Sequence, residues 1–262
     1  GAKASNYVLG DGSFTINPLN VDLTGVNLDG EREYDGTNLA YAADFLDGSG
    51  RVFIEGTGEW LSVNGQGTVA SADVQRDAAG NLARQDVSLG NLALIDGTGT
   101  NAGLGQNYTL NTASLLITPV GISVSGSRSY DGTTTAGAGD MHQATRVSDG
   151  MQNTVAAGGT FNTGIGSEQL VLVGAANTPS RNVGGYTGIN HGTLALNDSG
   201  STKAGNYELV DVDFDISKAL ITISTDQVTK TYDGTTTADG TPVAKDGTLF
   251  NGDSFVGGDF RF

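Results

Sequence analysis

The stretch Arg128-Ser129-Tyr130-Asp131-Gly132-Thr133-Thr134 contains a tetrapeptide that occurs three times in this chain. Identical copies of Tyr-Asp-Gly-Thr begin at residues 34, 130 and 232, so successive copies lie 96 and 102 residues apart. The residue two positions before the tyrosine is basic in every copy: Arg32, Arg128 and Lys230. Positions i and i−2 share a face on an extended strand, so we expect the cation to lie beside the ring.

Further sequence matches recur with a similar spacing of about 100 residues. The pattern Asn-Tyr-x-Leu begins at residues 6, 107 and 206, and an isoleucine follows nine residues after each tyrosine, at 16, 117 and 216. Residues 90–94 match residues 192–196 as Gly-x-Leu-Ala-Leu, and residues 59–63 match residues 168–172 more loosely. A repeat of fixed period defines the folding unit, so it is the frame for every other prediction.

The repeat frame divides the chain into modules of about 100 residues. Residues 1–15 are then the tail of a preceding repeat, 16–116 and 117–215 are complete modules, and 216–262 are the first half of a further repeat. Pro18 and Pro119 follow two of the isoleucines, as is typical of an exposed joint between modules. An array has the same composition at any phase, so the fold can also begin elsewhere within the period.

Short strands dominate the expected secondary structure. Apolar residues alternate in segments 21–28, 122–125 and 220–223, whereas the run 170–173 is apolar throughout and is compatible with burial on both faces. Clusters rich in glycine, of which the chain has 41, separate these runs and suit tight turns. The pattern predicts an all-β fold of tandem β-sandwich-like modules arranged as an elongated rod, with a β-grasp-like module as the alternative. Residues 39–46 are the best candidate for a minor helix.

Charge and composition exclude several classes of function. The chain has 29 acidic and 13 basic residues and a formal net charge of −16, which repels phosphate backbones and anionic bilayers. We therefore expect no nucleic-acid partner and no membrane insertion. The absence of cysteine excludes disulfides, thiolate metal sites and thiol nucleophiles.

Few residues are of the types that carry catalysis. His142 and His191 lie outside any metal or triad motif, and the glycine-rich segments precede strands rather than helices, so neither an enzyme nor a cofactor is predicted. Asp211, Asp213 and Asp215 alternate on an expected strand and therefore share a face. They are weak candidates for calcium, although a solvated acidic face is the simpler interpretation.

Aromatic residues supply the only candidate binding residues. Tyr34, Tyr130 and Tyr232 could each contribute to a sugar site, but a folding signature is the simpler interpretation, with aspartate and glycine forming a turn after the tyrosine. Trp60 is the only tryptophan and could form a stacking platform for carbohydrate. Its setting, Trp60-Leu61-Ser62-Val63, is typical of a packed strand, so the favoured prediction is that Trp60 fills a core.

The order of these motifs resembles the YDG-type repeats of filamentous-haemagglutinin-like adhesins, which are large exoproteins of Gram-negative bacteria. The openings at Arg128 and Lys230, the segment Asn182-Val183-Gly184 and the closing Gly205-Asn206-Tyr207 carry the resemblance, which covers essentially the whole chain. The first repeat departs from it at Asn38 and Gln106. The resemblance implies export across the outer membrane, commonly by two-partner secretion, and tandem modules that form a stalk. It implies no catalytic site.

The leading expectation is therefore a structural stalk or fibre segment of a secreted bacterial surface adhesin, with neighbouring repeats of the same chain as its partners. One alternative is a carbohydrate-binding module that contacts a glycan on a host or bacterial surface. Another is a module that associates with itself through edge strands in contacts between cells or in a biofilm.

Overall fold

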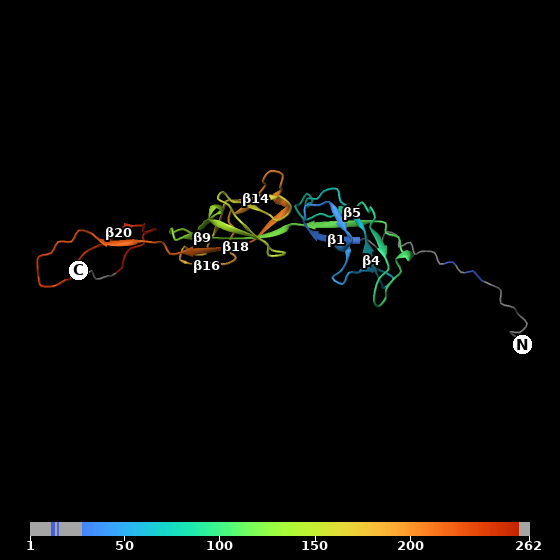
Figure 1. Cartoon of the computed structure of the whole chain (residues 1–262), viewed down its shortest axis with the longest axis horizontal. Coiled ribbons are helices and arrows are strands. Elements are labelled where there is room, and N and C mark those ends of the chain that lie inside the picture. The colour runs from blue at the N-terminus through green and yellow to red at the C-terminus, as the bar shows by residue number, and fades with distance from the viewer. Residues whose placement is uncertain (1–11, 14, 16–27, 257–262) are drawn as a thin grey trace, which may run out of the picture. The chain divides into compact units, whose positions relative to one another are not determined.

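The computed structural model describes residues 12–13, 15 and 28–256, and divides the chain into two compact units, Gly1–Thr118 (unit 1) and Pro119–Phe262 (unit 2) (Figure 1). The predicted tail at 1–15 lies almost wholly outside the described residues, as does the first Asn-Tyr-x-Leu pattern. Of the predicted strand segment 21–28, only Leu28 is described. The described residues form a mostly β structure of several small sheets, and their only helices are single 3₁₀ turns. The all-β prediction is confirmed at this level.

The described part of unit 1 contains three small sheets. One has the strand order β1-β8-β6, the second pairs β2 with β5, and the third has the order β3-β4-β7. Its strands are β1 (Leu28–Glu33), β2 (Leu39–Tyr41), β3 (Val52–Ile54), β4 (Glu59–Asn64), β5 (Gln66–Thr68), β6 (Gln85–Asp86), β7 (Ala93–Ile95) and β8 (Ala113–Thr118). Its 3₁₀ turns are η2 (Ala42–Phe45) and η3 (Gly105–Asn107).

Unit 2 repeats this plan with a larger central sheet, of order β12-β11-β9-β18-β16. Two further sheets have the strand orders β10-β15 and β13-β14-β17, and a hairpin pairs β19 with β20. The strands are β9 (Val120–Ser129), β10 (Thr135–Gly137), β11 (Met141–Arg146), β12 (Gln152–Thr154), β13 (Thr160–Asn162), β14 (Gln169–Val173), β15 (Ala175–Asn177), β16 (Gly184–Tyr186), β17 (Ala195–Asn197), β18 (Tyr207–Ser217), β19 (Thr222–Thr225) and β20 (Pro242–Asp246). The 3₁₀ turns are η4 (Ala138–Asp140) and η5 (Ala204–Asn206).

The sequence matches occupy equivalent places in the two units. Residues 59–63 lie in β4 and residues 168–172 in and just before β14, and these strands are the centres of the sheets β3-β4-β7 and β13-β14-β17. The Leu-Ala-Leu matches end in β7 and β17, which pair antiparallel with those two centres. The repeat seen in the sequence is therefore a repeat of strand pairing.

The first and last strands of each repeat lie side by side and run parallel. In unit 1 the register of β1 and β8 runs from Leu28 opposite Ala113 to Glu33 opposite Thr118. In unit 2 the register of β9 and β18 runs from Val120 opposite Tyr207 to Ser129 opposite Ser217, and Figure 1 shows these two strands together. Parallel neighbours start at the same end of a sheet, so the chain starts a repeat at one end and leaves it at the other.

The closing strands extend past the predicted module boundaries. Strand β8 runs through Ile117 to Thr118, and β18 runs through Ile216 to Ser217, so both isoleucines are buried residues of a last strand. One residue, Pro119, lies between β8 and β9 in the chain. The boundaries at 16–116, 117–215 and 216–262 stay predictions.

Alternation along the strands builds each core. In β8 every second residue is buried, and β9 and β18 contribute Ile122, Val124, Val212 and Phe214 in the same way. The apolar run in β14 follows the same rule, because Leu170 and Leu172 are buried while Val171 and Val173 are only half-buried. Burial of that run on both faces is therefore not found.

The predicted minor helix at 39–46 is wrong as a helix of that length. Residues 39–41 are strand β2, paired with β5, and only residues 42–45 form a 3₁₀ turn. The Asp44 carboxylate accepts the Tyr41 N–H at 2.8 Å and so fixes the start of this turn. The Phe45 ring is buried over Gly30, where an added Cβ would lie 2.8 Å from the ring. Strand pairing and this close packing override the local helical preference of an alanine-rich segment.

Candidate functional site

The three Tyr-Asp-Gly-Thr segments form the same turn. The aspartate Oδ1 accepts the backbone N–H and the hydroxyl of the threonine two residues later, at 2.8 and 2.9 Å for Asp35, 2.9 and 2.9 Å for Asp131, and 2.9 and 2.8 Å for Asp233. The glycine between them has a φ of +80° at Gly36, +78° at Gly132 and +80° at Gly234. Residues other than glycine rarely adopt this backbone conformation.

The basic residue two positions before each tyrosine clamps this turn. Arg32 Nη2 donates to the Thr37 carbonyl at 2.7 Å, Arg128 Nη2 donates to the Thr133 carbonyl at 2.8 Å, and Lys230 Nζ donates to the Thr235 carbonyl at 3.1 Å. Each cation also pairs with the aspartate of its own turn. The sequence predicted a cation beside the tyrosine ring. The observed contacts of each cation are with the threonine carbonyl and the aspartate of the turn.

Hydrogen bonds to the aspartates favour their charged form. Burial works to raise the pKa of Asp35 and of Asp131, but the hydrogen bonds from the threonine and the arginine outweigh it and hold both pKa values below the ordinary value. At Asp233 the hydrogen bond from Lys230 is the largest cause of a lowered pKa. The turns are thus stabilised by ionised carboxylates.

The backbone of the first two tyrosines joins the start of a repeat to its last strand. Tyr34 N–H donates to the Thr118 carbonyl at 2.9 Å, and Tyr130 N–H donates to the Ser217 carbonyl at 2.8 Å. The rings differ in exposure: Tyr34 is 6 % exposed, Tyr130 is half-buried and Tyr232 is 92 % exposed. The shared features therefore support the interpretation of the motif as a folding signature, and the surroundings of the rings do not repeat.

The tyrosines of the closing Asn-Tyr-x-Leu pattern also have equivalent contacts. Tyr108 hydroxyl donates to Glu59, and Tyr207 hydroxyl donates to Glu168, which is the matching glutamate of unit 2. Burial, together with the hydrogen bond to Glu59, raises the pKa of Tyr108. This bond ties the end of each repeat to the first residue of β4 or to the residue just before β14.

Trp60 lies on the outer face of unit 1, so the prediction that it fills a core is wrong. Leu61 and Val63 point into the core, and the alternation of β4 leaves Trp60 half-buried on the opposite face. Phe53, which is 46 % exposed, stands directly across from it, with ring centroids 5.0 Å apart. The Arg51 guanidinium lies 4.2 Å from the centre of the Trp60 ring. We call Arg51, Phe53 and Trp60 the aromatic face.

The sequence contained a signal for this placement that the packed-strand interpretation overlooked. Trp60-Leu61-Ser62-Val63 can bury only one of its two alternating pairs, and Leu61 with Val63 is the purely aliphatic pair. Phe53 and Arg51 could not be assigned to the same face from sequence, because their pairing with β4 depends on the register of β3.

Unit 2 carries an amide pair where unit 1 carries the aromatic pair. The register of β13 and β14 places Asn162 opposite Gln169, as that of β3 and β4 places Phe53 opposite Trp60. Gln169 Nε2 donates to Asn162 Oδ1 at 2.9 Å. The strands beneath are alike, since Leu61 and the equivalent Leu170 are both completely buried. The aromatic face is thus a feature of unit 1 and absent at the matching positions of unit 2.

The predicted polar candidates have ordinary structural contacts. Asp213 Oδ1 accepts the Gly188 N–H at 3.1 Å, and Asp211 Oδ1 accepts the Val212 N–H at 2.9 Å. Asp215 lies exposed in the same strand, β18. In the described part of the chain no three His, Asp or Glu side chains gather as a metal site, and calcium at these residues stays a prediction. His142 Nε2 lies 3.1 Å from the Ser127 carbonyl.

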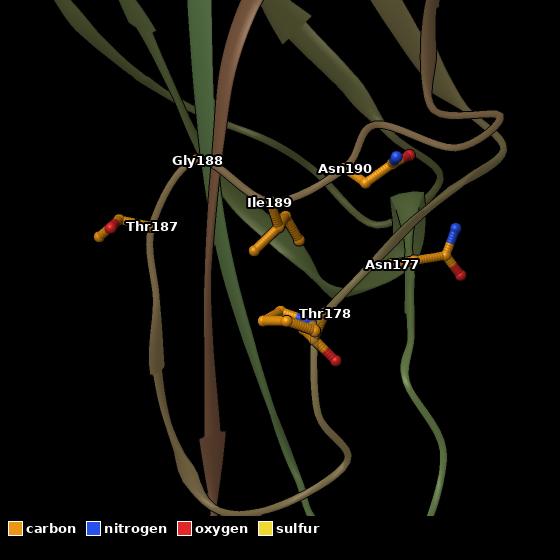
Figure 2. Close-up of a pocket in the computed structure, with 7 residues that line it drawn as sticks. Asn177, Thr178, Thr187, Gly188, Ile189 and Asn190 are labelled. Atoms are coloured by element: carbon orange, nitrogen blue, oxygen red, sulfur yellow. The ribbon is translucent and has the colours of Figure 1, made fainter.

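A shallow polar hollow of about 380 Å³ lies on unit 2, which sequence reasoning did not find. Figure 2 shows the residues that form it, which come from the end of β15 with the segment that follows and from the segment between β16 and β17. Its lining residues are Asn177, Thr178, Pro179, Thr187, Gly188, Ile189 and Asn190. Asn190 Oδ1 accepts the Gly192 N–H at 2.8 Å, so this amide is already used in the turn that precedes β17. No aromatic ring lines the hollow.

Comparison with protein-family models, with curated proteins and with solved structures gives no match. Within the described residues, no helix has the length and apolar character needed to cross a bilayer. The repeated architecture, the turns and the aromatic face are therefore the observations on which a function can be argued.

Proposed function

We propose that this chain is a structural stalk or fibre segment of a large secreted adhesin on the bacterial cell surface. In this proposal, β-sandwich-like modules of about 100 residues follow one another as an elongated rod. The observation that carries the proposal is the parallel pairing of the first and last strands in both repeats. This pairing makes the chain leave each module at the end opposite to its start, so added modules lengthen the molecule.

The link between the repeats supports the same proposal. Strand β8 ends at Thr118 and β9 begins at Val120, so only Pro119 separates them. A proline has a fixed φ and no N–H donor, which limits the conformations of a one-residue link. Such a link favours a stiff array over freely moving modules.

Composition suits a long exported fibre. The net charge of −16 keeps repeated copies apart in solution and discourages pairing between exposed strand edges. The hydrogen-bonded turns and the buried cores stabilise each repeat without cysteine, so folding after export needs no disulfide formation. Export across the outer membrane, as in two-partner secretion, is part of the proposal and rests on the resemblance of the motifs.

Surface labelling and deletion of repeats test this function. We expect antibodies against the chain to label the outside of the intact bacterium. In-frame deletion of residues 119–217 is expected to shorten the fibre seen by electron microscopy and to preserve attachment by the remainder of the protein. Loss of all adhesion, with fibre length unchanged, would contradict a spacing role and favour direct binding by this segment.

The aromatic face supports a second candidate function, carbohydrate binding. Exposed aromatic rings are the side chains on which apolar faces of small ligands stack, and an adjacent arginine adds a donor that hydroxyl or carboxylate groups accept. Phe53 is the more open ring, because the Arg51 guanidinium lies over Trp60. The ligand would therefore stack on Phe53 or displace Arg51.

The equivalent amide pair of unit 2 supplies a matched control for this second candidate. The double substitution Phe53→Asn with Trp60→Gln gives unit 1 the outer pair that unit 2 already has, above an unchanged core. If the parent chain binds on a glycan array and this variant does not, while its melting temperature is unchanged, the site is established. A chain that binds no glycan, or a variant that binds as the parent does, would exclude it.

A further inference from the structure

The turn at Tyr130 is covered by a loop that lies about 120 residues later in the chain. Residues 249–253 follow the β19–β20 hairpin, in the segment 216–262 that the repeat frame assigns to a further repeat. The Phe250 ring meets the Tyr130 ring edge to face, with centroids 5.9 Å apart and planes at 82°. Tyr130 hydroxyl donates to Asp253 Oδ2 at 2.8 Å. A ring contact and a hydrogen bond therefore hold the same tyrosine at both its ring and its hydroxyl.

Two further polar contacts surround this pair. Asn251 Nδ2 donates to the Gly132 carbonyl, so the loop also binds the backbone of the Tyr-Asp-Gly-Thr turn. Arg181 Nη2 lies 3.7 Å from Asp253 Oδ1, which brings a cation to the carboxylate that accepts from Tyr130. The hydrogen bond to Asp253 raises the pKa of Tyr130. The loop thus contacts the ring, the hydroxyl and the turn backbone.

The loop has a backbone shape that presents Phe250 and Asp253 together. Asn251 has a φ of +48° and Gly252 a φ of +80°, and the Asp253 N–H donates to the Phe250 carbonyl at 2.9 Å. These bonds close a tight turn whose first and last residues are the two that contact Tyr130. Asn251 is one of two described residues other than glycine with a positive φ.

Gly132 has a second role beneath this loop. Besides its φ of +78°, a Cβ added at Gly132 would lie 2.7 Å from Phe250 Cβ and 2.6 Å from Asn251 Nδ2. The same addition at Gly234, in the third copy of the turn, would meet nothing within 4 Å. The absence of a side chain at Gly132 therefore allows the loop to approach as closely as it does.

Apolar residues complete the contact around a hollow of about 270 Å³. Tyr130, Val183 and Leu249 line it together with Ile221, which lies just before β19. Val183 belongs to the motif segment Asn182-Val183-Gly184, and it is 48 % exposed. The joint is therefore partly apolar and only loosely filled, as suits a contact between neighbouring repeats rather than a core.

We propose that the Tyr130 turn is a docking socket through which one repeat holds the next. The partner it accepts is a loop of a neighbouring repeat that carries an aromatic ring three residues before a carboxylate, here Phe250 and Asp253. This inference rests on the proposed stalk function and adds a residue-level account of how neighbouring repeats are kept in line. The Tyr130 side chain then holds the neighbouring repeat, Asp131 and Thr133 form the turn, and Gly132 serves both.

The third copy of the motif provides the matched control. Tyr232 is 92 % exposed, yet its turn has the same bonds between aspartate and threonine and the same clamp by a basic residue. Tyr130→Ala and Tyr232→Ala therefore remove the same side chain from the same turn, with and without a docked loop.

Amide exchange in the full chain tests the socket. We expect Phe250→Ala and Tyr130→Ala each to speed solvent exchange of the Asp253 amide about tenfold, measured by NMR, because the ring contact and the hydroxyl bond hold the loop. Tyr232→Ala is expected to leave this exchange unchanged. Phe250 lies outside the five-stranded sheet of unit 2, so Phe250→Ala removes the ring contact without altering that sheet. It therefore tests the socket even if Tyr130→Ala fails to fold.

The exchange experiment tests the docking socket separately from the stalk proposal. Equal exchange at Asp253 in the parent and in Phe250→Ala would overturn the socket, whatever the shape of the molecule. Acceleration by Tyr232→Ala as large as that by Tyr130→Ala would also overturn it. The stalk proposal is tested independently by fibre length and by solution scattering of the parent chain.

Discussion

Unit 1 and unit 2 share a pattern of strand pairing and differ in what they present on it. In both, the strand that opens the repeat pairs in parallel with the strand that closes it, β1 with β8 and β9 with β18. Both also bury a leucine at the same point of the short strand β4 or β14, Leu61 or Leu170. At the neighbouring outward positions, unit 1 has Phe53 with Trp60 and unit 2 has Asn162 with Gln169. The comparison teaches that the repeated residues hold the scaffold, while outward positions are free to acquire a separate role.

The largest expected effect comes from the equivalent core leucines. Leu61→Ala and Leu170→Ala should each destabilise their own unit by about 3 kcal/mol, because a completely buried leucine leaves a cavity. Each unit has its own core, so each substitution should shift one unfolding transition and leave the other in place, as followed by NMR signals of each unit in urea. A shift of both transitions by either substitution would break the picture of two independent repeats.

Equivalent glycines after β4 and β14 should give the next largest effect. Gly65 and Gly174 have φ values of +86° and +80°, and an added Cβ would lie 2.1 Å from the carbonyl oxygen of Asn91 or Thr193. Gly65→Ala and Gly174→Ala should each cost about 2 kcal/mol or more, measured by urea unfolding. Gly48→Ala is the control, since its Cβ would meet nothing within 4 Å and its φ is not in the left-handed region. Unaltered unfolding of both variants would show that neither unit needs a glycine in this turn for its stability.

The clamp on the Tyr-Asp-Gly-Thr turn should have a smaller effect. Arg128→Met removes donors to the Thr133 and Thr135 carbonyls and should lower the stability of unit 2 by about 1–2 kcal/mol in urea unfolding. Arg32→Met should act to a similar degree on unit 1, because both arginine side chains are 9 % exposed. Lys230→Met should change less, since Lys230 is more exposed. A Lys230→Met effect equal to that of Arg128→Met would contradict this order.

The smallest expected effect concerns two exposed aspartates, one in a turn of each unit. In unit 2, the hydrogen bond from Arg146 is the largest cause that lowers the pKa of Asp149 to about 2. In unit 1, burial works to raise the pKa of Asp47, and backbone N–H groups of Arg51 and Ser49 outweigh it. Because the folded pKa of Asp149 is depressed, its stabilising contribution is present above its ordinary value of 3.8 and is lost as the pH falls toward 2.

The carboxyl signals of these aspartates give the measurement. In an NMR titration, Arg146→Met should raise the pKa of Asp149 from about 2 most of the way toward 3.8. The pKa of Asp47 should stay where it is in that variant, which makes Asp47 the internal control. A pKa of Asp149 that does not move would show that backbone donors, and not Arg146, set it.

Much of the scaffold was predictable because it depends on short-range patterns. The recurring Tyr-Asp-Gly-Thr and Gly-x-Leu-Ala-Leu segments mark turns and strands whose geometry is set within a few residues. The parallel pairing of β9 with β18 was not predictable, because alternation fixes which face is buried and leaves the partner strand open. For the same reason the sequence did not show that Ile117 and Ile216 lie in the closing strands β8 and β18.

The candidate site was less predictable for a related reason. Trp60 was a candidate because it is the only tryptophan in the sequence. The side of the strand on which it lies is determined by Leu61 and Val63, the pair of β4 residues that enters the core. Phe53 and the Phe250–Asp253 loop were not found, because each depends on contact between segments that sequence spacing does not relate. Non-local packing therefore determines the two surfaces on which proposals rest, while local rules determine the repeats beneath them.

Solution scattering of the full chain tests the central claim most directly. If each repeat starts and leaves at opposite ends of a parallel pair about 33 Å long, the chain should scatter as a rod with a radius of gyration of roughly 30 Å or more. A compact protein of this length has a radius of gyration of roughly 18 Å. A value near 18 Å, with the pair-distance distribution of a globule, would contradict the proposal that repeats of this chain build a stalk.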